Sequence, residues 1–179
     1  MNIIVYGDEK DTTISDTLLK TLAKYGGVQF FSSSKLVCTP PKGSPRFLIY
    51  DTDKLPLTTN INGIFLFKNS FKHVDASKIP ESFFHVIDSQ NTRAIKCLKK
   101  TDQVVLTYGI DAKSTLTFSS LTATDAMINL QRYVKTKNKI LEPHEFPVKL
   151  GTQLEPNLVL LVCAVLLLSE IPATEGYEI

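Results

Sequence analysis

Residues suited to binding phosphate follow the first apolar run of the chain. The stretch from Ile3 to Lys20, IIVYGDEKDTTISDTLLK, contains an apolar run, a glycine, a polar turn, a threonine pair and then a helical pattern. In a phosphate-binding loop, backbone N–H groups and a helix N-terminus face the phosphates, a lysine reaches the terminal phosphates and a hydroxyl holds Mg²⁺. Gly7, Thr12 and Thr13 stand in the order that such a loop requires and are candidate nucleotide-binding residues.

The middle of this loop carries charges that oppose a polyanion. Asp8, Glu9 and Asp11 place carboxylates there, Lys10 offsets only one of them, and Asp11 stands where the lysine of a phosphate loop belongs. A carboxylate about 4 Å from a phosphate charge costs on the order of 1–4 kcal/mol. Tight ATP binding in the usual pose is therefore not expected. The corner is either the remnant of a phosphate loop or a plain strand–turn–helix connection, in which acidic residues favour the helix N-terminus.

A second group of polar residues offers weak candidates for a divalent metal. Asp51 and Asp53 follow one strand pattern, and His73 follows another. Because parallel strands place their carboxyl ends at one edge of a sheet, where ligands bind, Asp51 and His73 are candidate metal ligands. Ordinary polar loop residues are the alternative. The cysteines lack zinc-ligand spacing and no serine stands in a GxSxG context, so neither a zinc site nor a hydrolase is indicated.

Strand and helix patterns alternate over the first part of the chain. Short apolar runs at 2–6, 28–31, 46–50, 64–67, 84–87 and 104–108 predict strands. Apolar residues at helical spacing predict helices at about 13–25 and at 92–99. This alternation is typical of a parallel α/β sheet with crossover connections.

The pattern changes after Gly109. Segments at 114–121, 127–134 and 140–150 lack a helical period and are separated by turn-like residues, which predicts an antiparallel meander. The apolar run at 158–168, LVLLVCAVLLL, is too short to cross a membrane, which takes about 20 residues, and predicts a helix buried on all sides.

The predicted fold class is therefore α/β: a mainly parallel, P-loop-like sheet flanked by helices, then a small antiparallel β meander and a buried C-terminal helix. We expect one domain over residues 1–179. Its parallel part covers 1–110, the meander 111–150, and the helix and tail 151–179.

Composition narrows the function classes further. A hydrophobic content of 43% supports a packed core, and a net charge of +2 does not indicate a nucleic-acid surface. We interpret the lysines, including Lys135, Lys137 and Lys139, as a solvated surface. The N-terminus lacks the basic and long apolar regions of a signal peptide, so we expect a cytoplasmic protein with no membrane partner.

Taken in order, these motifs resemble the central, ATP-binding domain of the Mur ligase family, whose phosphate loop reads GTNGKTTT. Gly7, Thr12 and Thr13 match that loop, while Asp11 replaces its lysine and Lys10 its glycine. Enzymes of this family join amino acids to cell-wall precursors, or glutamates to folate, through an acyl-phosphate.

The resemblance continues at the next two strand ends. YDTDKLP at 50–56 is similar to the acidic cluster that helps the family bind magnesium, with Asp51 and Asp53 as the matching residues. FLFKNSFKHVD at 65–75 resembles the family's TN and DH motifs. There Asn69 and His73 match, while Lys72 replaces the aspartate before the histidine.

Three later segments extend the match to the end of the chain. VIDSQ at 86–90 resembles the adenine-binding NADDP motif and keeps its first aspartate as Asp88. VVLTYGID at 104–111 is similar to the family's following strand and turn. LGTQLEPNLVLLVCAVLLL at 150–168 resembles GRHNVLNALAA, with Gly151 and Asn157 matched.

The resemblance implies a nucleotide site and a magnesium site. The candidate residues are Gly7, Thr12, Thr13 and Asp88 for the nucleotide and Asp51 and His73 for the metal. The family's UDP-sugar-binding and amino-acid-binding domains have no counterpart in this sequence. We therefore expect a stand-alone, bacterial, non-catalytic relative without a cofactor, which acts by binding a protein partner or as a homo-oligomer. The alternative is a protein that keeps weak ATP and Mg²⁺ binding, or a ligase component completed by a partner chain.

Overall fold

The computed structural model describes residues 1–39, 46–55, 61–72, 78–99 and 103–179. The chain forms two compact units, the first made of residues 1–85 and 91–105 and the second of residues 86–90 and 106–179. Strand β6 (Phe83–Asp88) begins in the first unit and ends in the second. The expectation of one domain over 1–179 stays a prediction.

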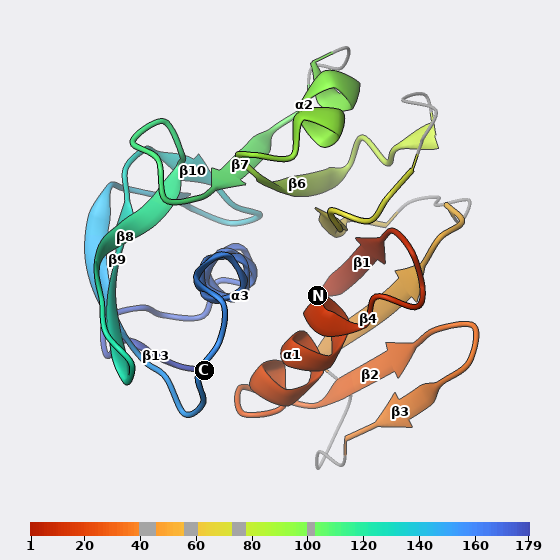
Figure 1. Ribbon diagram of the computed structural model, residues 1–179, viewed down its shortest axis with the longest axis horizontal. Coiled ribbons are helices and arrows are strands. Elements are labelled where there is room, and N and C mark those ends of the chain that lie inside the picture. Colours follow the sequence, from red (N-terminus) through yellow and green to blue (C-terminus); the bar gives the residue numbers. More distant parts are fainter. Residues whose placement is uncertain (40–45, 56–60, 73–77, 100–102) are drawn as a thin grey trace. The chain divides into compact units, whose positions relative to one another are not determined.

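The first unit is built on a sheet whose central strands are parallel (Figure 1). Its other strands are β1 (Asn2–Tyr6), β2 (Val28–Phe31), β3 (Leu36–Cys38), β4 (Phe47–Thr52) and β5 (Gly63–Phe67), in the spatial order β6-β5-β1-β4-β2-β3. β1 pairs in parallel with β4 on one side and β5 on the other, whereas β3 pairs antiparallel with β2. The carboxyl ends of β1, β4 and β5 therefore meet at one edge of the sheet.

Side chains of these strands and of the first helix form the core of the first unit. β5 is buried along its whole length, as expected for a central parallel strand covered on both faces. Helix α1 (Thr13–Leu22) contacts β4 and β2 and buries Leu18 and Leu22 completely. Helix α2 (Thr92–Leu98) begins after Asn91, whose side chain accepts a hydrogen bond from the Ala94 amide at 3.0 Å and caps the helix.

The second unit holds the antiparallel part. Its elements are β7 (Val105–Tyr108), β8 (Leu116–Leu121), β9 (Asp125–Leu130), β10 (Val134–Lys135), β11 (Ile140–Leu141), β12 (His144–Lys149), α3 (Pro156–Leu168) and β13 (Tyr177–Glu178). The spatial order is β13-β12-β9-β8-β7-β6, and β8, β9 and β12 form the predicted meander. β10 and β11 pair with each other as a separate hairpin.

Helix α3 is the core of the second unit. Every residue from Leu158 to Leu168 is at most 8% exposed, and in Figure 1 strands β8 and β9 curve beside the helix. Pro156 occupies its first turn, where the missing N–H group costs nothing. The predicted α/β fold class, with its mainly parallel sheet, antiparallel meander and buried helix, is confirmed. Among the described residues, no helix is both long and apolar enough to span a membrane.

Some predicted boundaries are wrong. The strand expected at 127–134 ends at Leu130, and Val134 lies in β10 after a bend at Arg132. The strand expected at 140–150 is divided at a bend at Pro143, because β11 pairs with β10 whereas β12 pairs with β9. The first helix ends at Leu22 rather than near residue 25, because its last turn tightens. The short strands β3 and β13 were not expected.

Candidate functional site

The corner between β1 and α1 turns at Gly7, where the backbone conformation and a close side chain require a glycine. The Gly7 amide donates to the Thr52 carbonyl oxygen at 3.1 Å, and its φ of +156° disfavours residues with a side chain. A Cβ atom at Gly7 would lie 2.6 Å from the Cβ of Lys68. Gly7 is therefore required here because another chain segment passes close to it.

Lys68 is the central residue of this corner, and the sequence analysis missed it. It follows β5, its backbone amide donates to the Tyr6 carbonyl at 2.9 Å, and its side chain is completely buried. The ammonium group donates to an Asp51 carboxylate oxygen at 2.6 Å and to the Asp8 carbonyl oxygen at 2.9 Å. Lys68 thus joins the carboxyl ends of three strands beneath the loop. The only signal in the sequence was a lysine directly after the apolar run IFLF.

Asp51, a predicted metal ligand, is engaged with this lysine. Its side chain is 2% exposed, and burial raises its pKa, while hydrogen bonds from Lys68 and Ser15 act in the opposite direction without cancelling that effect. Over the described ranges, no group of three or more His, Cys, Asp or Glu residues is arranged to hold a metal ion. His73, the other predicted ligand, lies outside the described residues. The metal site stays a prediction.

The loop satisfies several of its own polar groups. One carboxylate oxygen of Asp8 accepts a hydrogen bond from the Lys10 amide at 3.0 Å, and the Asp8 carbonyl accepts one from the Asp11 amide at 3.0 Å. In a phosphate loop such amides face the ligand. Here the Lys10 amide is bound by the Asp8 side chain of the same loop.

The remaining acidic residues tie the loop to its surroundings. Asp11 accepts a hydrogen bond from the Ser70 hydroxyl at 2.9 Å, and Glu9 accepts one from Ser33. Thr12 is the N-cap residue of α1, makes no side-chain capping bond and is exposed, as is Thr13. Gly7, Thr12 and Thr13 lie at this corner, and their role in nucleotide binding stays a prediction.

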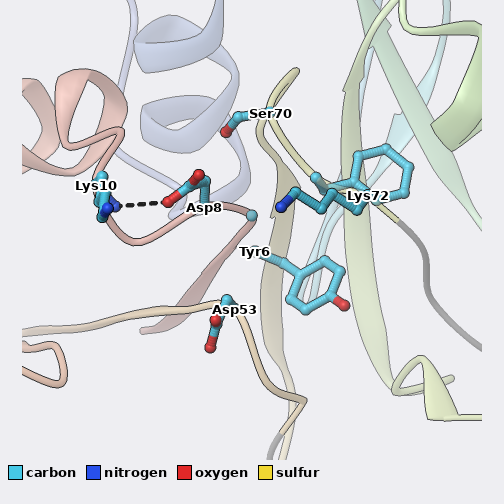
Figure 2. A pocket seen from close by; sticks show the side chains of 8 residues that line it. Tyr6, Asp8, Lys10, Asp53, Ser70 and Lys72 are labelled. Atoms are coloured by element: carbon cyan, nitrogen blue, oxygen red, sulfur yellow. Dashed lines mark hydrogen bonds between the residues drawn. The ribbon is translucent and has the colours of Figure 1, made fainter.

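A pocket of about 340 Å³ opens at the carboxyl ends of β1, β4 and β5. It is lined by Tyr6, Gly7, Asp8, Lys10, Asp53, Ser70, Phe71 and Lys72. In Figure 2, Asp8 and Asp53 approach it from the ends of β1 and β4, and Lys72 approaches from the segment after β5. Burial and the nearby Asp53 raise the pKa of Tyr6. The pocket thus mixes two lysines with two carboxylates, and its charges are balanced.

Asp88, the predicted adenine-binding residue, lies in the second unit at the end of β6. One carboxylate oxygen accepts a hydrogen bond from the Gln90 amide at 2.8 Å, and the other accepts one from the Asn157 side chain at 3.0 Å. Asp88 is 3% exposed, and Asn157 belongs to the first turn of α3. The structure thereby brings together two residues that the resemblance matched separately. In this unit Asp88 positions the start of α3, and its role with a nucleotide stays a prediction.

Comparison of the sequence with protein-family models and with curated proteins finds no match. Solved structures do match in fold. The MurF ligase from Thermotoga maritima in complex with ADP has a TM-score of 0.53 at 12% identity, over 95% of this chain and 45% of that one. The UDP-N-acetylmuramate:L-alanyl-gamma-D-glutamyl-meso-diaminopimelate ligase from Neisseria meningitides has a TM-score of 0.57 at 13% identity, over 98% and 65%. MurF from Acinetobacter baumannii has a TM-score of 0.54 at 11% identity, over 97% and 44%.

These likenesses confirm the resemblance at the level of the fold. Identities of 11–13% leave the active-site chemistry unspecified. The chain spans between 44% and 65% of the length of these ligases. It therefore has the fold of part of a Mur ligase.

Proposed function

We propose that this chain is a non-catalytic, Mur ligase-like domain that acts in the cytoplasm by binding another protein. The main observation behind this proposal is that polar groups at the corner between β1 and α1 already have hydrogen-bond partners within the chain. Lys68 is bound to Asp51 and to the Asp8 carbonyl, and Asp8 also occupies the Lys10 amide. A phosphate at this corner would have to displace partners that the chain already supplies.

The charge of the loop supports the same proposal. Phosphoryl transfer depends on cations that stabilise the charge of the phosphates. Asp11 stands at the lysine position of the resembling loop, and the cation beneath the loop, Lys68, is buried in an ion pair with Asp51. The Lys68 side chain is completely buried, so its ammonium group does not face solvent. The loop keeps the frame of a phosphate site without its charge.

A thermal-shift experiment with ATP and Mg²⁺ tests the proposal. A ligand at 100 times its dissociation constant stabilises the folded state by about 2.7 kcal/mol. We expect no shift in the melting temperature at millimolar MgATP. A concentration-dependent rise that requires both ATP and Mg²⁺ would refute the non-catalytic proposal and favour a nucleotide-binding protein.

A restored loop provides the matching positive control. Asp11→Lys with Lys10→Gly supplies the missing lysine and glycine, and Asp8→Gly removes the carboxylate that occupies the amide at position 10. We expect the triple variant to gain a thermal shift with MgATP that the wild type lacks. If a folded triple variant gains nothing, this corner does not derive from a phosphate site.

A second candidate function is weak nucleotide and Mg²⁺ binding in the pocket at the strand ends. Two observations favour it: Lys10 and Lys72 line the pocket, and a similar ligase, MurF from Thermotoga maritima, was solved in complex with ADP. Asp53 would then be available for Mg²⁺ because, unlike Asp51, it lies at the pocket wall. The same titration separates the two candidates. Lys72→Gln would abolish the MgATP shift under this candidate alone.

A further inference from the structure

The hairpin formed by β10 and β11 carries several positive charges and no negative charge of its own. The segment between Asp125 and Glu142 contains Arg132, Lys135, Lys137 and Lys139 and no acidic residue. All four basic side chains are exposed. A solvated surface usually intersperses charges of both signs, so this hairpin differs from the mixed surface that the composition alone suggests.

Hydrogen bonds to the residue that follows α3 also hold the turn of the hairpin. Glu170, which follows α3, accepts hydrogen bonds from the Thr136 hydroxyl at 2.7 Å, from the Asn138 amide at 2.7 Å and from the Asn138 side chain at 2.7 Å. Glu170 has a φ of 58°, a left-handed conformation that is uncommon for a residue with a side chain. These bonds fix the turn between the strands, so a partner would not have to order it on binding.

Two large apolar side chains stand among the exposed cations. Tyr133 is 69% exposed and Ile140 is 64% exposed. In the hairpin register Ile140 pairs with Lys135, and residues that pair directly lie on the same face. Val134 and Thr136 alternate with exposed neighbours and point inwards. One face of the hairpin therefore presents Tyr133, Ile140 and Lys135, with the exposed Lys137 in the adjoining turn.

We propose that this hairpin face is the docking site for an acidic segment of a partner protein. Tyrosine and arginine are enriched among the residues that dominate protein–protein binding, and a charged rim of opposite sign steers the encounter. Two apolar side chains are too few to anchor the chain to a lipid surface by burial. The whole segment from Arg132 to Leu141 carries only four cations and one aromatic ring, fewer than a groove that follows a nucleic-acid backbone provides.

The proposal names a surface for the protein interaction proposed above, and it rests on that function. The two can still fail separately. MgATP binding would refute the non-catalytic proposal without bearing on the hairpin. Failure of the hairpin test would leave the hydrogen bonds of the β1–α1 corner, and the MgATP result expected from them, unchanged.

The test measures fluorescence anisotropy of a short labelled peptide with the repeat Glu-Glu-Leu, titrated with the full chain at low salt. We expect saturable binding that weakens as salt screens the charges. The variant Lys135→Gln/Lys137→Gln/Lys139→Gln should bind about tenfold more weakly, because each exposed charge pair contributes modestly. Tyr133→Ala should weaken binding further without changing the charge.

A charge-matched control separates this site from general electrostatics. Lys20, Lys113 and Lys149 are also exposed and lie outside the hairpin, so Lys20→Gln/Lys113→Gln/Lys149→Gln removes the same charge elsewhere. It should bind the peptide within about twofold of the wild type. No peptide binding, or equal weakening in both triple variants, overturns the proposal. So does tighter wild-type binding to phosphatidylserine vesicles or to a single-stranded oligonucleotide than to the peptide.

Discussion

The β1–α1 corner and the β10–β11 hairpin use their lysines in opposite ways. At the corner, the Lys68 ammonium is buried and bound to Asp51 and to a loop carbonyl. At the hairpin, Lys135, Lys137 and Lys139 stand in solvent, and a carboxylate anchors the backbone and the polar side chains between them.

The contrast between buried and exposed lysines indicates where this chain presents positive charge that a partner could bind. Burying an ammonium group costs several kcal/mol unless a carboxylate and further hydrogen bonds compensate, so a buried pair is committed to the fold. Exposed cations cost little and remain free to meet an anion. The corner uses its cation within the fold, whereas the hairpin presents Lys135 and Lys137 to solvent.

The largest expected effect comes from breaking the buried pair. Lys68→Met leaves the Asp51 carboxylate buried without its cation and should lower the free energy of unfolding by about 3–5 kcal/mol. Lys35→Met breaks a pair with Asp16 in which both side chains are more than 40% exposed, and should cost less than about 1 kcal/mol. Urea unfolding of both variants measures the contrast. Equal losses would mean that the two kinds of lysine do not differ.

A smaller effect is expected from Gly7→Ala. The new methyl group meets the Lys68 side chain, which cannot move without breaking its buried bonds, and the backbone must keep a φ of +156°. Strain of this kind costs about 1–3 kcal/mol. Gly26→Ala is the control for a close contact without a positive φ, because its methyl group would lie 2.9 Å from the Cβ and Cδ atoms of exposed Arg46. A Gly7→Ala variant as stable as the control would show that the corner can accommodate a side chain at this position.

The smallest expected effect concerns the hairpin anchor and its pH dependence. Hydrogen bonds from Asn138 and Thr136 lower the pKa of Glu170 from 4.5 to about 2. Since the folded pKa is depressed, the anchoring contribution is complete above pH 4.5 and is lost as pH falls through about 2.

The amide signal of Asn138 in an NMR titration reports this anchor. It should stay unchanged through pH 4.5 and move only as the pH approaches about 2. Glu170→Gln should remove that transition. A midpoint near 4.5 in the wild type would mean that the carboxylate does not hold the hairpin.

Much of the fold could be predicted from the sequence because burial leaves a simple pattern. The strands at 2–6 and 28–31 match β1 and β2, since short β-branched runs suit strands covered on both faces. β13 contains only two residues, Tyr177 and Glu178, and offers no periodicity to detect. The split of the last meander strands depended on Pro143 and on a bend at Arg132, which an apolar count does not reveal.

The candidate site was harder to predict. Gly7, Thr12 and Thr13 could be placed at one corner because their order along the chain is local information, and their role in nucleotide binding stays a prediction. Lys68 could not, because a lysine after a strand usually faces solvent and its partner Asp51 lies 17 residues earlier in the sequence. Asp51 was predicted to be a metal ligand because its pairing with Lys68 is likewise not visible in the sequence. The arrangement of this corner depends on an ion pair between residues far apart in the sequence, and a single sequence does not reveal such a pair.

The central claim is that the loop amides at the corner are occupied by the chain itself. The most direct measurement follows the backbone amide signals of Lys10 and Asp11 by NMR during titration with MgATP. We predict that both signals stay in place at millimolar ligand, because Asp8 already accepts their hydrogen bonds. A saturable movement of both signals that requires Mg²⁺ would contradict it.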